Sequence, residues 1–175
     1  MAPSSYSTAG PDDAYIYWAK TYNQAVGDVL PTSPVPGVVD IRFILINGSI
    51  PDANMIEGMT EYLQQRGKRP LTDLVVVAAP DIVAYDIEFT YYINVSDINK
   101  AVHVQQKVSE AVNKYKLWQS EKIGRDINPD ELTALLNKAG VKRAEIISPV
   151  FTVLKDIEVA VLSNINIIYG GLEND

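Results

Sequence analysis

The sequence predicts an α+β protein built from two small sandwich units, and two observations lead to this prediction. First, 175 residues make one domain or two small ones, at roughly 150 residues per domain, and the 47% hydrophobic and 21% charged fractions are those of a globular protein. Second, the expected elements run α-β-β-α-β and then β-α-α-β-β, so most strands neighbour another strand. We therefore expect two ferredoxin-like units, 1–80 with an N-terminal lead-in and 81–175, each with a mostly antiparallel sheet covered by helices on one face.

In the first unit, apolar periodicity predicts helices over 14–22 and 51–66 and strands over 26–30, 39–45 and 74–79. Pro11 and the two aspartates after it form a favourable start for the first helix. Three prolines, Pro31, Pro34 and Pro36, follow the first strand and are expected to end it, because proline cannot donate to a sheet ladder. Gly67 is expected to end the second helix as its C-cap.

In the second unit, the predicted strands cover 86–95, 141–147 and 159–169, and the predicted helices cover 96–122 and 128–140. The first of these strands has the clearest alternation of apolar and polar residues in the chain. Ser96 and Asp97 are expected to cap the longer helix. Asn128 and Pro129 are an N-cap and first-position pair for the shorter helix, and Gly140 is expected to end it.

Charge and composition exclude several classes of function. With 15 Lys plus Arg against 22 Asp plus Glu, the formal net charge is −7, whereas nucleic-acid binding needs clustered positive charge. The chain has no cysteine, which removes disulfides, thiolate metal sites and thiol nucleophiles. No apolar run is long enough to span a membrane, and the start of the chain lacks the pattern of a signal peptide. We therefore expect a soluble protein made in the cytoplasm, with neither nucleic acid nor membrane as a partner.

One motif is similar to a calcium-binding loop. Asp126, Asn128 and Asp130 occupy the first three alternating ligand positions of such a loop. The similarity stops there, because Glu131 and Asn137 stand where the loop needs a glycine and a closing glutamate. We interpret these residues as a helix start, and the sequence predicts no metal site.

The remaining polar motifs do not form a catalytic set. A basic cluster of Arg66, Lys68 and Arg69 could contact a phosphate, but positive charge after a helix C-terminus is also favoured by the helix dipole, and we prefer that interpretation. His103 is the one histidine of the chain and has no second histidine with which to share a metal. Glycine-rich phosphate loops and nucleophile elbows are absent from the sequence. The sequence therefore predicts no catalytic residue and no cofactor.

Aromatic residues crowd the first predicted helix, at Tyr15, Tyr17, Trp18 and Tyr22. Aromatic side chains of this kind anchor protein interfaces. Packing of the helix against a core explains them equally well. We retain both interpretations and name these four residues as interface candidates.

Segments spread over most of the chain resemble one protein family. The matching segments are 9–15, 18–19, 28–29, 33–34, 36–37, 69–73, 75–80, 124–127, 132, 135, 140–141, 148–149 and 169–171. The most specific are Arg-Pro-Leu-Thr-Asp at 69–73, the Val-Val-Val-Ala-Ala-Pro run that follows it, and Gly-Arg-Asp-Ile at 124–127. In order and spacing they resemble the C-terminal portion of the baseplate J-like family, the wedge proteins of contractile phage tails and related injection systems.

This resemblance implies a structural role in a virion tail baseplate, without catalytic residues. It implies contacts with copies of the same chain and with other wedge subunits, including a lysozyme-like-fold wedge protein and a tail protein I. Family members are commonly longer at the N-terminus. Two alternatives stay open: a regulatory α+β module that binds a small ligand, and an enzyme whose carboxylates meet only in three dimensions.

Replacing Asn128 by alanine is expected to lower the free energy of unfolding by about 1 kcal/mol, because the first amides of the helix lose their side-chain acceptor. Denaturant unfolding of the two proteins measures this difference. A change near zero in a folded variant would contradict the capping role.

Overall fold

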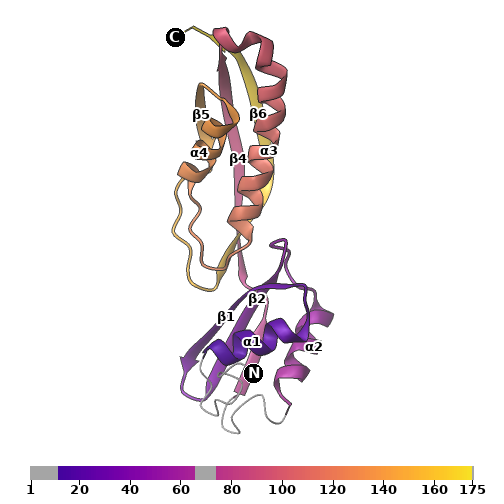
Figure 1. Cartoon of the computed structure of the whole chain (residues 1–175). Coiled ribbons are helices and arrows are strands. Elements are labelled where there is room, and N and C mark those ends of the chain that lie inside the picture. The colour runs from indigo at the N-terminus through magenta and orange to yellow at the C-terminus, as the bar shows by residue number, and fades with distance from the viewer. Residues whose placement is uncertain (1–11, 66–73, 175) are drawn as a thin grey trace. The chain divides into compact units, whose positions relative to one another are not determined.

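The computed structural model describes residues 12–65 and 74–174 and separates into two compact units (Figure 1). The first unit holds the chain up to Asp81 with segments Glu121–Ile123 and Asp156–Glu158, and the second holds Ile82–Ser120, Gly124–Lys155 and the chain from Val159. The elements follow the predicted order, with helices and strands segregated as in other α+β proteins, so the predicted fold class is confirmed.

The first unit is a three-stranded sheet with two helices. Its elements are α1 (Asp12–Tyr22), β1 (Val26–Val35), β2 (Val38–Leu45), α2 (Ala53–Leu63) and β3 (Leu74–Ala78). The strand order is β1-β2-β3, in which β1 and β2 are antiparallel and β2 and β3 are parallel. Helix α1 packs on β1, α2 packs on β3, and the two helices touch each other. Both helices therefore cover the same face of the sheet.

Alternation along the strands decides which side chains the helices cover. Ile41 and Phe43 on β2 are fully buried and join Val75 and Val77 of β3 in one cluster with residues of α1 and α2. Between the two buried residues of β2, Arg42 points to the opposite face, where its Nε lies 2.9 Å from Asp40 Oδ2. The face without helices therefore carries an ion pair on its central strand.

Strand β1 departs from the predicted proline corner. It continues through Pro31 and Pro34 to Val35, whereas the sequence predicted its end at residue 30. The reason is its position at the edge of the sheet, where a missing N–H on the unpaired side removes no ladder hydrogen bond. The predicted cap Gly67 lies outside the described residues, and α2 ends with Gln64 as its C-cap.

The second unit has the same two-layer construction. Its elements are β4 (Asp81–Asn94), the 3₁₀-helix η2 (Val95–Lys100), α3 (Ala101–Ser120), α4 (Pro129–Ala139), β5 (Arg143–Ser148) and β6 (Glu158–Glu173). The strand order is β5-β4-β6. Strand β5 is antiparallel to β4. The side chain of Asp86 accepts a hydrogen bond from Asn164, and that of Glu88 accepts one from Asn166. Residue numbers therefore increase in the same direction along β4 and β6, and these two strands are parallel.

Each sheet therefore contains one antiparallel and one parallel pair, where the sequence predicted mostly antiparallel sheets. Within the described residues each sheet has three strands, one fewer than the ferredoxin-like arrangement. The start of the long helix also differs from the prediction. A 3₁₀ turn precedes α3, and the side chain of Asn94 accepts from Ser96 N at 3.1 Å in place of a cap by Ser96 and Asp97.

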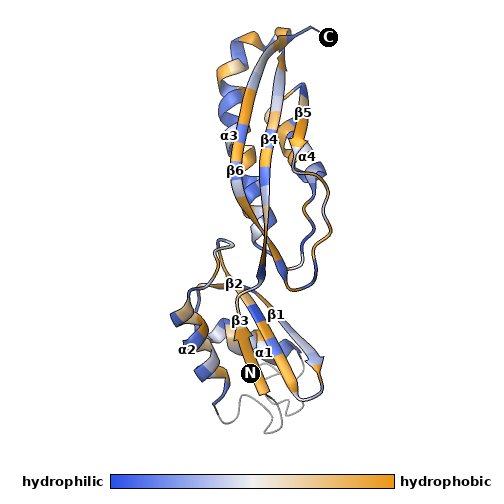
Figure 2. Ribbon diagram, turned by 180° about the vertical axis from the view of Figure 1, so that it is seen from behind, coloured by the Kyte–Doolittle hydropathy of each residue, from blue (hydrophilic) through white to orange (hydrophobic). Residues whose placement is uncertain are grey.

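Strand β4 supplies the centre of the second core. Its odd-numbered residues from Tyr85 to Ile93 are buried against α3 and α4, and its even-numbered residues face the open side of the sheet. Figure 1 shows α3 running along β4, and Figure 2 shows apolar and polar residues alternating along β4 and β6. Period-two alternation is the pattern expected of a strand covered on one face.

Gln119 is a buried polar residue whose hydrogen bonds hold the connection between α3 and α4. Its Nε2 donates to the carbonyl oxygens of Arg125 at 3.2 Å and Asp126 at 3.1 Å. Its Oε1 accepts from the Tyr115 hydroxyl at 3.3 Å and from Asn128 N at 3.4 Å. Because the side chain is fully buried, these partners replace the water that it would otherwise bind.

The predicted caps of α4 are present. The Asn128 side chain accepts from Asp130 N at 2.9 Å, Pro129 occupies the first turn, and Gly140 adopts the left-handed conformation with φ of 96°. A residue with a side chain is disfavoured at that φ, which explains the glycine. Asp126 does not cap the helix; its Oδ1 accepts from Leu154 N at 2.9 Å.

Replacing Gln119 by leucine is expected to lower the free energy of unfolding by about 3 kcal/mol, because the buried Tyr115 hydroxyl, two part-buried carbonyls and an amide lose their partner. Gln106→Leu on the exposed side of the same helix is the matched control and should change stability little. Denaturant unfolding followed by circular dichroism compares the two variants. Equal stabilities would show that the hydrogen bonds of Gln119 are dispensable.

Candidate interaction surfaces

The four aromatic residues predicted for an interface occupy different environments on α1. Tyr15 is 1% exposed and belongs to the core of the first unit, while Trp18 and Tyr22 are half-buried against that core. Tyr17 is 40% exposed, and its ring meets that of Trp18 edge to face at 5.0 Å. Tyr15 is therefore a core residue of the first unit, and an interface role for Tyr17, Trp18 and Tyr22 stays a prediction.

The other motifs of the sequence have structural partners or lie on the surface. Asp126 accepts a hydrogen bond from Leu154 N, and Asn128 accepts one from Asp130 N at the start of α4. Among residues 12–65 and 74–174, no group of three or more His, Cys, Asp or Glu side chains could hold a metal ion. His103 is exposed on α3. The basic cluster Arg66, Lys68 and Arg69 lies outside the described residues.

No helix of the described chain has the length and apolar character needed to cross a membrane. Two kinds of surface are of interest: the sheet faces that the helices leave uncovered, and one exposed apolar segment.

That segment, residues 147–153, begins with the last two residues of β5 and continues beyond the strand. It is here called the apolar segment. Four of its large apolar side chains are exposed: Ile147 by 63%, Val150 by 67%, Phe151 by 60% and Val153 by 71%. Isolated exposed apolar residues are common on protein surfaces, but four within seven positions form a patch of the kind that marks an interaction site.

The framework of the second unit holds the apolar segment in place. Thr152 forms an antiparallel bridge with Ile127, with N···O distances of 2.9 and 3.1 Å. Leu154 is buried, and its amide donates to Asp126 as described above. Inward Thr152 and Leu154 thus alternate with outward Phe151 and Val153, which gives the segment an exposed apolar side.

Sequence reasoning missed this segment. The run from Val150 to Leu154 has apolar residues at four of five positions and no polar face. Such a run is typical of a strand covered on both sides. In this unit the protein covers only the side of the run that carries Thr152 and Leu154. The apolar residues on its other side could have indicated a surface for another molecule.

A cavity of about 350 Å³ lies beside the apolar segment and includes Tyr85, Pro149 and Asn164 in its lining. The Tyr85 hydroxyl is buried and has no hydrogen-bond partner among the described residues. Burial raises the pKa of this phenol above its ordinary value. At neutral pH it is therefore a hydrogen-bond donor and not a base, so it does not supply the general base that an enzyme would need.

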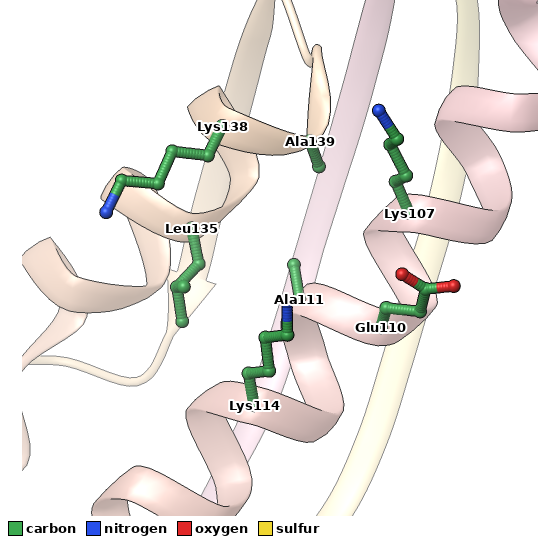
Figure 3. Close-up of a pocket in the computed structure, with 7 residues that line it drawn as sticks. All are labelled: Lys107, Glu110, Ala111, Lys114, Leu135, Lys138 and Ala139. Atoms are coloured by element: carbon green, nitrogen blue, oxygen red, sulfur yellow. The ribbon is translucent and has the colours of Figure 1, made fainter.

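A second hollow, the α3–α4 groove, lies between the two helices of the second unit (Figure 3). Its volume is about 180 Å³. Its lining consists of Lys107, Glu110, Ala111 and Lys114 from α3 and Leu135, Lys138 and Ala139 from α4. Three lysines thus surround an apolar floor in a chain whose net charge is negative.

Alanine substitutions separate the core aromatic residue of α1 from the exposed one. Tyr15→Ala is expected to lower the free energy of unfolding by about 3 to 5 kcal/mol, because a large buried side chain is removed. Tyr17→Ala should lower it by about 1 kcal/mol or less, since the variant loses mainly its contact with Trp18. Denaturant unfolding tests both values, and equal losses would place Tyr17 in the core as well.

Comparison with known proteins follows the division into two units. The model of the baseplate J-like central domain matches residues 7–79, and that of the baseplate J-like protein C-terminal domain matches residues 85–168. Baseplate protein J of Escherichia phage P2 is 27% identical over 169 aligned positions, and the match covers 94% of this chain and 54% of that protein. The chain therefore spans about half the length of this relative.

A chain in the cryo-EM structure of the anti-feeding prophage baseplate, 6-fold symmetrised, has a similar fold. The TM-score is 0.56 with 13% sequence identity, and the match covers 85% of this chain and 36% of that one. At this identity the likeness concerns the fold. The two domain models, in contrast, describe one family and match nearly all of the sequence in its natural order. This protein belongs to the baseplate J-like family and contains its central and C-terminal domains.

Proposed function

We propose that this chain is a structural subunit of the baseplate of a contractile phage tail or a related injection system, and that it acts through protein–protein contacts. Membership of the baseplate J-like family and the similarity to protein J of phage P2 support the proposal. The proposal places the chain at the tail baseplate of the virion. It assigns no catalytic step to the chain.

The apolar segment is the structural observation that carries this proposal. Burying a side chain the size of valine, isoleucine or phenylalanine is worth about 1.5 to 3 kcal/mol each. Four such side chains are held outward by a framework that is itself hydrogen-bonded. A partner protein that covers them gains this energy without ordering a flexible loop, since the segment is already fixed.

The family resemblance supplies the candidate partners. We propose contacts with other wedge subunits, among them a lysozyme-like-fold wedge protein and a tail protein I, and with copies of this chain. We also propose that residues 1–80 and 81–175 are separate folding units, which is supported by the separate clusters of buried residues in the two halves.

Immunogold labelling of purified tails tests the function. A tagged copy of the full chain is expressed in cells that produce contractile tails, and the tag is located by electron microscopy. Label at the baseplate end is expected. Absence of label from intact tails whose baseplate is accessible to antibody would contradict a baseplate role and would favour the small-ligand alternative.

The same assay tests the apolar segment. The double variant Phe151→Ser and Val153→Ser should fold normally, because both side chains are exposed, and should lose most of its label at the tail end. Val102→Ser is the matched control, since Val102 is an apolar residue 82% exposed on α3 outside the segment. Equal labelling of all three proteins would show that another surface makes the contact.

A further inference from the structure

We infer that the α3–α4 groove of one copy of this chain binds the open sheet face of a second copy. The groove is rimmed by lysines, and the sheet face carries an excess of carboxylates, so the two surfaces of the second unit have opposite charge. The inference deepens the proposed structural function and depends on it for its biological meaning. It names the surface through which copies contact one another.

The three lysines of the groove outnumber its one carboxylate. Lys107 and Lys114 lie on the same side of α3, seven residues and about 10 Å apart along the axis. Lys138 lines the groove from the last turn of α4, and its side chain extends away from α3 in Figure 3. None of the three forms an ion pair with a carboxylate of the described residues, and Glu110 is the single acidic residue of the lining.

The open sheet face carries two aligned carboxylates whose hydrogen-bond partners are neutral. Asp86 Oδ1 accepts from the amide and side chain of Asn164 at 3.0 and 2.9 Å, and Glu88 accepts from Asn166 at 3.1 Å. Asparagine is neutral, so these bonds orient the carboxylates and leave their charge unbalanced. Asp86 and Glu88 are two positions apart on β4, which corresponds to about 7 Å along the strand.

A second group of charged side chains lies at the other end of the face. Arg143 of β5 pairs with both Glu145 and Glu173, and Lys142 also acts on the charge of Glu173, so the charges at this end of the face are close to balanced. Its guanidinium also stacks 4.2 Å from the centre of the Tyr92 ring. Glu145 lies opposite Thr90, which places it about 13 Å along the sheet from Asp86. The unbalanced carboxylates of the face are therefore Asp86 and Glu88, whose separation of about 7 Å is within the length of the lysine row.

The geometry of the second unit favours contact between copies over contact within one copy. Helices α3 and α4 cover one face of the sheet, and the carboxylates lie on the opposite face. A groove cannot reach the acidic face of its own unit. Contact between different surfaces of two copies is heterologous, and repetition of such a contact produces a ring or an open stack.

Sedimentation velocity of the purified full chain tests this inference without any tail. The chain should sediment as species larger than the monomer at low ionic strength and return to the monomer at high ionic strength, because exposed charges are screened by salt. The groove variant Lys107→Glu, Lys114→Glu and Lys138→Glu should weaken association by about tenfold or more. The face variant Asp86→Lys and Glu88→Lys should do the same.

Mixing the two variants is the decisive step. Each variant alone has like charges on both surfaces, whereas the mixture places lysines opposite carboxylates again. The mixture is therefore expected to associate although neither variant does. If the reversed charge of the face variant disturbs folding, the neutral variant Asp86→Asn and Glu88→Gln takes its place, because it keeps the acceptors for Asn164 and Asn166. This neutral variant should also weaken association.

A matched control separates the groove from the effect of net charge. Lys20→Glu, Lys116→Glu and Lys122→Glu change the net charge by the same amount at exposed positions outside the groove, and this variant should still associate. A monomeric natural chain at every ionic strength, a groove variant that associates normally, or a mixture that stays monomeric would each overturn the inference. Any of these results would leave the labelling of tails unaffected, so the two proposals fail separately.

Discussion

Coverage of each sheet by helices on one face only is the constraint on which the rest of this structure depends. In the first unit α1 and α2 lie on one side of β1-β2-β3, and in the second α3 and α4 lie on one side of β5-β4-β6. A two-layer unit has one buried sheet face and one free face. The apolar residues of each strand are therefore concentrated at the positions that face the helices.

Polar hydrogen bonds then determine where the segments outside the two layers lie. Gln119 receives and donates bonds that fix the turn between α3 and α4, and the same turn presents Asp126 to the amide of Leu154. The apolar segment is thus anchored to the core through groups that are satisfied inside the protein. A surface that is rigid before binding loses little conformational entropy when a partner covers it.

The second unit combines three different surfaces on one small framework. The apolar segment suits a contact dominated by burial of nonpolar area, whereas the α3–α4 groove and the acidic sheet face suit contacts that depend on salt. Electrostatic contacts contribute orientation and selectivity, and apolar contacts contribute most of the binding energy. A subunit of an assembly with several neighbours needs both kinds.

The sequence by itself determined the element order, the α+β class and the ends of α4, because alternation, proline at the first turn and glycine at the left-handed position are local properties. Tertiary structure alone decided the parallel pairings, the passage of β1 through Pro31 and the exposure of the apolar segment. These depend on partners far away along the chain, such as Asp86 and Asn164 or Ile127 and Thr152. Local patterns record which face of a segment is apolar, but not which other segment, or which other molecule, covers it.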